Sequence, residues 1–402
     1  MKTTAFKNTD IGPIPDDWEV KKLGELCEVL DNRRIPLNDS QRKKGPYPYC
    51  GANGIVDYID RYAFEGKVIL IAEDGGNFSD FATRPIAYQM DGKFWVNNHA
   101  HVLVSKEGVC QEFLFCQLVH KDITDVISGG TRAKLTRGQL DDLLMVLPPL
   151  PEQRRIAAAL SDADELVASL DKLIEKKKRV KEGAMQRLLS GETRLPGFTG
   201  KWVEKRVDDL IDAISTGLNP RQNFRLNNGG ANYYVTIKDF KDGVLDFSGC
   251  DRIDDAALRM INARSNLRSG DILFSSIGRI GDAYVVEHEP SNWNVNESVF
   301  VLHPNTTVDS HYLYYMIRSS RTQSQLQGAS TGTTMTGIKI GHLQRIVCWM
   351  PPTLAEQRAI AAMLSDMDEE IAALARERTE AERIKQGMMQ ELLTGKTRLK
   401  GE

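Results

Sequence analysis

The sequence predicts an α+β protein, in which two long antiparallel coiled-coil helices separate two mixed α/β domains. Three observations predict this fold. The chain has 402 residues, too many for one ordinary hydrophobic core and suited to two or three domains of about 100–200 residues. A stretch from the middle of the chain recurs at its C-terminal end. Both copies of this stretch have the apolar spacing of a coiled-coil helix. We therefore predict a tandem duplication with pseudo-twofold symmetry.

The repeat is strongest in its helical part. Residues 152–195 align without gaps with residues 356–399, and 24 of the 44 positions are identical. Weaker similarity continues outside it: the segment WEVKKLGELCEVL beginning at Trp18 resembles WVEKRVDDLIDAI beginning at Trp202. The repeat divides the chain into four predicted parts, namely domain 1 (1–147), a central spacer helix (148–195), domain 2 (196–350) and a C-terminal spacer helix (351–402).

Each spacer is predicted to be one long helix. Apolar residues follow one another at 4-3 intervals from Ile156 to Ile174 and continue through Val180, and the second copy repeats the pattern from Ile360 through Ile384. Such a seam indicates a coiled coil. A helix of about 39 residues is roughly 58 Å long, and it needs a partner to bury its seam. The other copy is the natural partner. The connections then require the helices to run antiparallel, with the domains at opposite ends.

The two domains are predicted to be mixed in structure, with topologies that the sequence does not determine. Runs of β-branched and aromatic residues between turn residues indicate strands. The strands are expected at Val68–Ala72, Trp95–Val104, Tyr233–Ile237, Asp271–Ser275 and Ser298–Leu302, and short helices at Val20–Leu30, Glu112–His120, Arg206–Ile214 and His311–Arg318.

Composition excludes several classes of protein. Hydrophobic residues make up 41% and charged residues 27% of the chain, and no apolar run approaches the roughly 20 residues of a membrane span. The N-terminus lacks the apolar core of a secretory signal, so we expect a cytoplasmic protein. Six cysteines without a Cys-x-x-Cys pair predict free thiols. With 52 basic and 55 acidic residues the net charge is −3, which argues against a nucleic-acid partner.

Motifs of catalysis are nearly missing from the sequence. It has no Gly-x-Gly-x-x-Gly and no Walker loop. Glu65-Gly-Lys67 matches the Glu-x-Lys of many nucleases, but a solvated turn before a strand is the more ordinary interpretation. His99 and His101 would share one face of a strand. Because the matching segment 295–301 has no histidine, a polar or base-reading face is favoured over a metal site. We predict no catalytic residue and no metal ligand.

Polar loops recur at equivalent places in the two halves. Residues 128–137 and 330–339 combine hydroxyls, cations and glycines, the groups that phosphate oxygens accept. Arg and Asn elsewhere suit base edges, since Arg pairs with guanine and Asn with adenine. Taken singly, each is more often an ordinary loop residue. The candidate DNA-binding residues are Tyr47, Tyr49, Asn53, Asn77, Arg84, Asn97, His99, Thr131, Arg132, Lys134, Arg137, Arg221, Arg225, Lys238, Arg279, Asn296, Thr333, Thr334, Thr336 and Lys339.

Two motifs of the repeat carry a family resemblance. Pro-Pro-x-x-Glu-Gln-Arg-x-Ile-Ala stands at 148–157 and, with one residue more, at 351–361, and Leu-Leu-x-Gly-x-Thr-Arg-Leu at 188–195 and 392–399. Together they resemble the specificity subunit of type I restriction–modification enzymes. The resemblance covers essentially the whole chain, and it is specific because both copies of the motifs occur in the right order. The two domains match the family only through short motifs.

The resemblance implies a non-catalytic reader of DNA. Each domain would read one half of a bipartite, asymmetric site in double-stranded DNA, and the helices would set the gap between half-sites, about 10 bp centre to centre. The helices would also dock two methyltransferase subunits. S-adenosylmethionine, ATP and Mg are then expected in the methyltransferase and restriction/translocase subunits, with no cofactor in this chain. The candidate residues for docking or spacing are Glu152, Gln153, Arg154, Glu356, Gln357 and Arg358.

Two alternatives stay open at this point, a self-contained DNA nuclease or methyltransferase and a coiled-coil scaffold that binds only proteins. The charge does not separate them. It divides as −3 for residues 1–147 (18 basic, 21 acidic), +2 for 148–195 (10 and 8), 0 for 196–350 (16 and 16) and −2 for 351–402 (8 and 10). Since no part is strongly basic, either basic residues gather on one face of each domain or partners supply much of the affinity. We expect weak DNA binding by the isolated chain.

Overall fold

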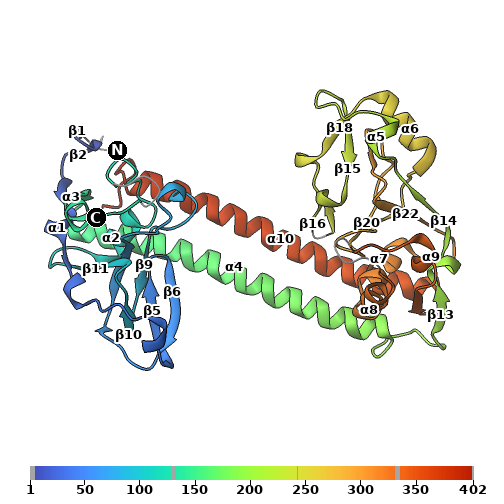
Figure 1. The fold of residues 1–402 in the computed structure, drawn as a ribbon, viewed down its shortest axis with the longest axis horizontal. Helices are drawn as coiled ribbons and strands as arrows, with labels where there is room; N and C mark the ends of the chain where they lie inside the picture. The colour runs from blue at the N-terminus through green and yellow to red at the C-terminus, as the bar shows by residue number, and fades with distance from the viewer. Residues whose placement is uncertain (1–4, 128–132, 242, 331–335, 401–402) are drawn as a thin grey trace. The chain divides into compact units, whose positions relative to one another are not determined.

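The computed structural model describes residues 5–127, 133–241, 243–330 and 336–400 (Figure 1). The chain forms two compact units. Unit 1 consists of Met1–Asp171 and Arg376–Glu402, and unit 2 of Lys172–Ala375. Each unit contains one domain and part of each long helix. No helix among the described residues is long and apolar enough to cross a membrane.

Domain 1 contains two four-stranded sheets, with strand orders β6-β5-β10-β7 and β4-β11-β8-β9. All five residues of β8 are buried. The strands are β1 Phe6–Thr9, β2 Gly12–Pro15, β3 Glu19–Lys22, β4 Cys27–Val29, β5 Lys44–Gly51, β6 Gly54–Ile59, β7 Phe64–Glu65, β8 Val68–Ala72, β9 Ala87–Met90, β10 Lys93–Val96, β11 Ala100–Ser105 and β12 Leu144–Leu147. The helices are α1 Leu23–Leu26, α2 Gln111–Leu118 and α3 Arg137–Asp142.

Domain 2 contains a four-stranded sheet, β14-β22-β19-β20, and a three-stranded sheet, β18-β15-β21. The strands are β13 Val203–Arg206, β14 Ile211–Thr216, β15 Asn232–Val235, β16 Phe240–Lys241, β17 Val244–Leu245, β18 Asp251–Ile253, β19 Ile272–Ser275, β20 Ala283–Val285, β21 Trp293–Val295, β22 Val299–Pro304 and β23 Val347–Met350. The helices are α5 Pro220–Asn223, α6 Asp255–Ser265, α7 Ser310–Arg318, α8 Ser320–Ala329 and α9 Ile340–Leu343.

The two domains share a strand plan. In domain 1, β11 pairs antiparallel with β8, and β10 pairs parallel with β5. In domain 2, β22 pairs antiparallel with β19, and β21 pairs parallel with β15. In each domain a further antiparallel pair joins an early strand to the strand that directly precedes the long helix. These pairs are β3 with β12 and β13 with β23. The common plan confirms the predicted duplication of a mixed α/β domain.

The long helices are α4, Leu150–Ser190, and α10, Leu354–Leu392. In unit 1, Asp164 of α4 pairs with Lys385 of α10, and Asp171 pairs with Arg378 at 2.8 Å. In unit 2, Lys177 pairs with Glu370 at 2.5 Å. A later residue of α4 thus meets an earlier residue of α10, so the helices run antiparallel within unit 1, as predicted. The pair of Lys181 with Asp368 shows the same direction in unit 2.

The predicted apolar seam is wrong at one position of each helix. Val180 and Ile384 are exposed by 52% and 51%. The 4-3 spacing continued from Ile174 leads to position 181, where Lys181 pairs with Asp368; in the second copy Lys385 pairs with Asp164 in the same way. Burial lowers the pKa of Lys181, and the hydrogen bond to Asp368 opposes that shift. Paired charges therefore replace the seam here and turn Val180 and Ile384 outward.

Two predicted helices are strands instead. Residues 20–30 form β3, the single turn α1 and β4, and residues 206–214 form mainly a 3₁₀ turn and β14. Their apolar spacing suits a helix, but pairing with a neighbouring strand overrides such a local preference. The predicted strand 95–104 is two strands, interrupted at Asn97–His99. The helices α2 and α7 and the strands β8, β19 and β22 confirm their predictions within one or two residues.

Each domain packs on the start of the long helix that follows it. In unit 1, Trp18 and Phe113 of domain 1 form a buried cluster with Ile156 and Leu160 of α4. In unit 2, Leu313 of α7 belongs to the cluster that includes the first turns of α10. Burying a side chain of this size contributes about 2 kcal/mol. The contact therefore holds each domain against its helix.

A glycine that lies against a tryptophan follows each long helix, Gly191 directly after α4 and Gly395 three residues after α10. Gly395 has a φ of +72°, and a Cβ there would meet Pro15 at 2.5 Å and the ring of Trp18 at 3.2 Å. Gly191 has a φ of +74°, and a Cβ there would meet the ring of Trp202 at 3.2 Å. Both positions thus require glycine for conformation and for space.

Candidate nucleic-acid interface

A hollow of about 510 Å³ with a mixed polar and apolar lining opens on domain 1. Its walls are the turn between β5 and β6, the residues after β8 and the residues after β10. Three of the predicted DNA-binding residues come together in it, Asn53, Asn97 and His99, with Asp74 beside them. Ile55 and Val56 add exposed apolar surface, at 45% and 63% exposure. Amides, a histidine and small apolar groups are the side chains that contact base edges and thymine methyl groups.

Backbone bonds hold Asn97 in a tight turn between β10 and β11. Its N–H donates to the carbonyl oxygen of Cys50 at 3.0 Å, and its Oδ1 accepts the N–H of His99 at 2.8 Å. The amide Nδ2 lies 3.3 Å from where a Cβ at position 51 would stand, so Gly51 leaves room for it. Asn53 donates to the carbonyl of Gly75 at 2.9 Å. The two amides therefore have defined places in the hollow, where Asn53 is exposed and Asn97 is only 7% exposed.

Domain 2 repeats the asparagine turn. The N–H of Asn296 donates to the carbonyl of Val235 at 2.9 Å, and its Oδ1 accepts the N–H of Ser298 at 3.1 Å. The surroundings differ, because β15 leads to the hairpin β16–β17, and Val244 on that hairpin is 62% exposed. Both domains thus hold an asparagine by the same two backbone bonds, while the residues around that asparagine differ.

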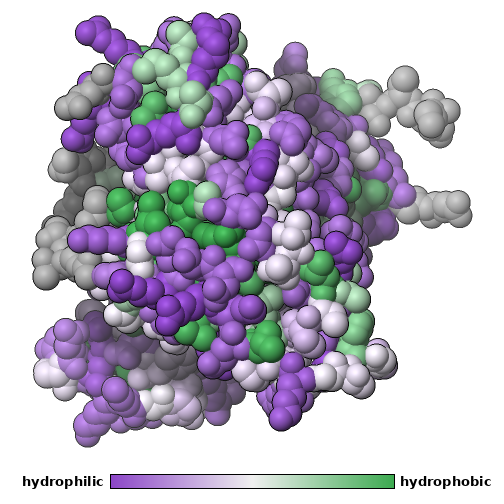
Figure 2. Space-filling view, turned by 90° about the vertical axis from the view of Figure 1, so that its right-hand side faces the viewer, coloured by the Kyte–Doolittle hydropathy of each residue, from purple (hydrophilic) through white to green (hydrophobic). Residues whose placement is uncertain are grey.

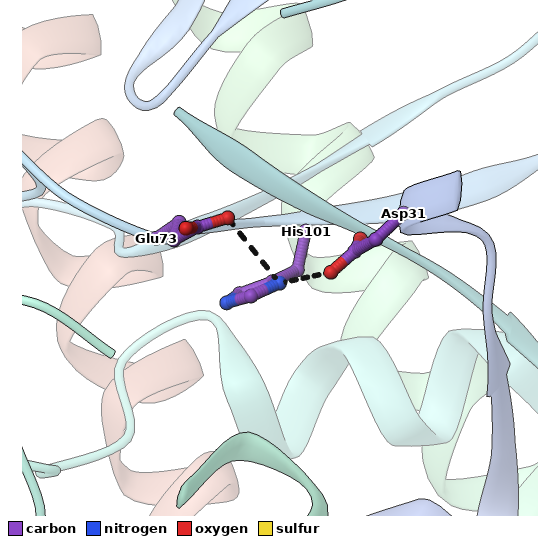
Figure 3. Close-up of side chains that lie close together, drawn as sticks. All are labelled: Asp31, Glu73 and His101. Carbon is purple, nitrogen blue, oxygen red and sulfur yellow. Dashed lines mark hydrogen bonds and ion pairs between the residues drawn. The ribbon is translucent and has the colours of Figure 1, made fainter. Parts of the chain in front are cut away.

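A buried charge cluster lies next to the hollow (Figure 3). His101 is 1% exposed, and its Nδ1 lies 2.5 Å from Asp31 and 3.7 Å from Glu73. These three side chains are close enough to share a metal ion. The carboxylates already have cationic partners, however, since Arg34 pairs with both and Lys134 with Glu73 at 2.9 Å. Two fixed cations oppose a further one, so the geometry favours a charge network.

The network shifts the pKa of both carboxyl groups in the same direction. Burial of Asp31 opposes ionisation, but hydrogen bonds from His101 and Val102 and the charge of Arg34 hold its pKa below the usual value. Burial likewise opposes the shift of Glu73, and Arg34 and Lys134 lower its pKa. Both side chains are therefore ionised at neutral pH.

The recurrent polar loops end beside these strands. Lys134 forms an isolated bridge to Asp74, and Gly337 forms the matching bridge to Ile277. Arg137 begins α3 and pairs with Asp141 at 2.7 Å, while Thr336 and Lys339 are exposed. Thr131, Arg132, Thr333 and Thr334 lie outside the described residues.

The remaining DNA candidates are scattered and partly engaged within the protein. Asn77 donates to the carbonyl of Pro85, Arg84 pairs with Asp80 at 3.6 Å, and the ring of Tyr47 lies tilted against that of Tyr62. Lys238 pairs with Asp251 at 2.9 Å. Arg279 donates to the carbonyls of Ile237 and Phe240. Arg221 and Arg225 are exposed. On the face drawn in Figure 2 the described residues are mainly hydrophilic, with hydrophobic residues in small groups.

The prediction for Tyr49 is wrong. Its side chain is 1% exposed, its hydroxyl accepts the N–H of Leu37 at 3.1 Å, and Arg42 covers its ring. A side chain so enclosed has no surface to offer a base. The signal that misled is an aromatic residue in a polar stretch, which is as common in a sheet core as in a binding surface.

The docking prediction is wrong for four of its six residues. Glu152, Gln153, Glu356 and Gln357 are buried, and each bonds within its own unit. Gln153 accepts the N–H of Cys110, and Gln357 that of Asp309. The two glutamates bind arginines from the Thr-Arg-Leu motif at the far end of the other helix, Glu152 with Arg398 and Glu356 with Arg194. The motif residues thus close each unit. Only Arg154 and Arg358 are exposed.

The Glu65–Lys67 nuclease match has no site around it. Glu65 faces Lys93 at 4.0 Å, whereas Lys67 pairs with Glu112 at 2.5 Å. Sequence reasoning missed other residues of the hollow, above all Asp74, Ile55 and Val56. The Asn53-Gly54 dipeptide between two apolar runs is a hairpin signal, and it could have placed the turn that forms one wall.

The comparisons with known proteins agree with this architecture. A model of the type I restriction modification DNA specificity domain matches residues 15–179 and again 199–383. The chain therefore belongs to this family, whose members are the non-catalytic DNA-recognition subunits of type I restriction–modification enzymes, and it carries the domain twice. The duplicated match confirms the tandem repeat, and the self-contained enzyme and the protein-only scaffold are not favoured.

Relatives of similar length support the same assignment. A putative type I restriction enzyme specificity subunit of Haemophilus influenzae is 28% identical over 353 residues, which are 87% of each chain. The putative MjaX specificity subunit of Methanocaldococcus jannaschii is 26% identical over 99% of this chain and 98% of its own.

Solved structures resemble the chain in fold. The S subunit of a type I restriction–modification system from M. genitalium has a TM-score of 0.62 and 15% identity, over 93% of this chain and 96% of its own. A chain from a structure concerned with complex assembly and conformational transition of a type I system has a TM-score of 0.54 and 21% identity, over 96% of this chain and 99% of its own. At these identities the likeness supports the α+β fold alone.

Proposed function

We propose that domain 1 and domain 2 each read one half of a bipartite, asymmetric site in double-stranded DNA. The observation that carries this proposal is the matched pair of asparagines, Asn97 and Asn296, held by equivalent backbone bonds in two otherwise divergent domains. An asparagine amide pairs with the N6 and N7 of adenine. Because His99 stands two residues after one asparagine and Ser298 after the other, the same frame serves two different half-sites.

Phosphate contacts complete each reading surface. Lys134 bridges to Asp74 in the wall of the domain 1 hollow, and Arg137 follows it in sequence at the start of α3. Thr336 and Lys339 take the matching place in the sequence of domain 2 and are exposed. Such contacts set register and orientation without sequence preference. With a net charge of −3, the chain alone has little electrostatic attraction for DNA, so most of the affinity comes from its partners.

The long helices set the gap between half-sites and dock two methyltransferase subunits. Val180 in unit 2 and Ile384 in unit 1 support the docking role, because each is a large apolar side chain about half exposed at the same position of the repeat. Beside each lies a paired lysine, Lys181 or Lys385. One matched position in each unit suits two copies of one partner.

The chemistry then belongs to the partners. Methyl transfer from S-adenosylmethionine is assigned to the methyltransferase subunits, and ATP- and Mg-dependent cleavage to the restriction/translocase subunits. This chain supplies sequence choice and holds no cofactor of its own.

Exchange of one domain tests the proposal. Residues 1–147 are replaced by those of a relative with a different specificity, and methylated bases are mapped genome-wide in a host that carries the complete system. The expected result is a change in one half-site, with the other half-site and the gap retained. Exchange of residues 196–350 is the matched control and changes the other half. An unchanged motif, or methylation by the purified chain alone, contradicts the proposal.

Docking is tested separately by native mass spectrometry of the assembled complex. Val180→Asp and Ile384→Asp each place a charge in the proposed contact, and each is expected to remove one methyltransferase subunit. The double variant removes both. Arg383→Ala, which changes an exposed residue next to Ile384, serves as the control and keeps the full complex. Retention of both subunits by the double variant contradicts this surface.

A further inference from the structure

A pocket of about 320 Å³ opens in unit 1, where α2 meets the two long helices. Its apolar wall includes Phe115, Cys116, Val119, Leu160 and Met389. Burial raises the pKa of the Cys116 thiol to about 12, so the thiol carries no charge at neutral pH. The ion pair of Asp164 with Lys385 also lines the pocket. The pocket therefore combines apolar surface with one carboxylate and one ammonium group.

Unit 2 has the matching helices in the same register. The residue directly before α2, Cys110, donates its N–H to Gln153, and the residue directly before α7 donates its N–H to the matching glutamine of α10. Counted from these two residues, Cys116 of α2 corresponds to Tyr315 of α7. Unit 2 thus has a tyrosine side chain at the position where unit 1 has a cysteine in the wall of the pocket.

The contacts of Tyr315 define the chemistry of this place. Its side chain is 3% exposed, its hydroxyl donates to Asp368 at 2.8 Å, and the Nζ of Lys181 lies 5.5 Å from the centre of its ring. Asp368 and Lys181 form an ion pair, the counterpart of Asp164 with Lys385. A cation near an aromatic ring and a carboxylate that accepts from a phenol hydroxyl are both favourable. In unit 2 one phenol ring thus joins α7 to both long helices.

The matching place in unit 1 has room for a ring of this kind. Asp164 and Lys385 are exposed by 55% and 26%, more than their counterparts in unit 2 at 40% and 12%. Val119 stands where unit 2 has Arg318, so a second side chain is shorter there too. The pocket volume of about 320 Å³ exceeds the roughly 150 Å³ of a cavity that holds benzene. A single ring with a hydroxyl therefore fits the pocket in size and in polar partners.

We propose that this pocket binds a small phenol, a molecule with one aromatic ring and a hydroxyl group. The hydroxyl donates to the Asp164 carboxylate, the Lys385 ammonium lies near the ring, and the apolar wall covers the rest of the molecule. The bound ring then joins α2 to α4 and α10 in unit 1, as Tyr315 joins α7 to them in unit 2. This site does not involve DNA reading, so its tests are independent of the proposed function.

The first test measures binding to the full chain without DNA, with p-cresol as the probe. NMR of protein labelled with ¹³C in its methionine methyl groups reports Met389 in the pocket, and Met185, its counterpart in unit 2, is the internal control. We expect the Met389 signal to shift saturably with a dissociation constant of about 1 mM or less, because so small a molecule contributes few contacts. No saturable shift of Met389, or equal shifts of both methionines, overturns the proposal.

The second test measures what the hydroxyl contributes. Toluene has the ring of p-cresol without the hydroxyl, and we expect it to bind about tenfold more weakly. Asp164→Ala removes the acceptor and reduces this preference to about twofold or less. Asp162→Ala, at an exposed position of the same helix, is the matched control and keeps the preference. A preference that Asp164→Ala leaves unchanged overturns the assigned contact.

The third test fills the pocket from within. Cys116→Tyr gives unit 1 the side chain that unit 2 has, and it is expected to abolish the p-cresol shift of Met389 and to raise the melting temperature by a few degrees. Glu107→Tyr, which adds a tyrosine at an exposed position before α2, is the control and keeps p-cresol binding. Undiminished binding by folded Cys116→Tyr overturns the proposal. If that variant does not fold, the Asp164→Ala comparison still decides.

The last test uses the complex assembled with its methyltransferase subunits. Saturation-transfer NMR of p-cresol compares the complex that contains the unchanged chain with the complex that contains Cys116→Tyr. We expect binding to the first complex and its loss in the second. If the unchanged chain binds p-cresol alone but not in the complex, a partner chain covers the pocket, and the assignment to a small molecule is overturned.

Discussion

The two units close their helix ends with the same motif but with unequal contacts. In unit 1, Arg398 binds both Glu152 and Asp17 and lies over the ring of Trp18, whose Nε1 donates to Glu152 at 3.2 Å. In unit 2, Arg194 binds Glu356 and two backbone carbonyls, and the indole N–H of Trp202 has no hydrogen-bond partner among the described residues.

Chain connectivity explains the difference. Arg194 is followed directly by the segment that leads to Trp202, so the covalent chain already keeps these groups together. Arg398 and Trp18 are 380 residues apart, and only side-chain bonds join them. In unit 1, where no short stretch of chain joins Arg398 to Trp18, the helix end has the larger number of side-chain bonds. The two copies of the motif therefore differ in the expected direction: the copy without a covalent connection nearby makes more non-covalent contacts.

The largest expected effect is the loss of Arg398. Arg398→Ala leaves the Glu152 side chain, 3% exposed, without a cation, and breaking a buried pair in this way costs about 3–5 kcal/mol of unfolding free energy. We expect the loss of unfolding free energy for Arg194→Ala to lie at the lower end of that range, because it leaves only one carboxylate without its cation and Arg398→Ala leaves two. Urea denaturation measures both. Adding Glu152→Gln to Arg398→Ala is expected to restore part of the loss, and full additivity of the two changes would contradict a direct pair.

Trp18 and Trp202 are expected to contribute unequally to the stability of the two helix ends. Trp18→Phe removes a donor and leaves Glu152 short of one bond, at a cost of about 1–3 kcal/mol. Trp202→Phe removes an indole N–H that has no partner, so its cost is only the lost ring area, about 1 kcal/mol or less. Thermal unfolding of the two variants shows the difference. Equal losses would mean that the N–H of Trp18 contributes nothing.

Acid weakens unit 1 through the same residues. Hydrogen bonds from Arg398 lower the pKa of Asp17 to about 2. Burial opposes the shift of Glu152, and bonds from Arg398 and Trp18 lower its pKa. A lowered carboxyl pKa stabilises the protein above the unfolded value, and that stability disappears as the pH falls from about 5 to 2.

The substitution Asp17→Asn shows how much Asp17 contributes to the loss of stability in acid. Asp17 is 45% exposed, so Asp17→Asn removes about 1 kcal/mol or less at neutral pH and flattens the acid side of the stability curve. Asp10→Asn, at an exposed position, is the control and leaves the curve unchanged. A steep acid side retained by Asp17→Asn would contradict the assigned role.

The sequence predicts most strongly where one physical signal repeats. The 4-3 spacing from Ile156 and the duplicated motifs predict both long helices, which the structure places at Leu150–Ser190 and Leu354–Leu392. The prediction fails at Val20–Leu30, where β3 pairs with β12, whose residues come 122 to 128 positions later in the chain. It fails again at Glu152, because nothing local to a Glu-Gln-Arg motif shows that Arg398 will bury it.

The candidate site follows the same rule. Asn97 and Asn296 stand out because both halves keep them, and the structure gives them equivalent bonds. Asp74 and Arg34 do not stand out, since an isolated charged residue in a polar stretch is most often solvated. Their roles arise only when the end of β8, the residues after Val29 and residues 133–136 meet in space.

The claim that each domain reads its own half-site is tested by mapping methylated bases for Asn97→Asp and Asn296→Asp in a complete system. Aspartate keeps the oxygen that accepts the backbone N–H and loses the amide donor, so the turns persist while base reading is lost. We expect Asn97→Asp to relax or abolish specificity in one half-site and Asn296→Asp in the other, with no shared position. Changes at the same positions in both variants, or an unchanged motif in both, would contradict the claim that each domain reads its own half.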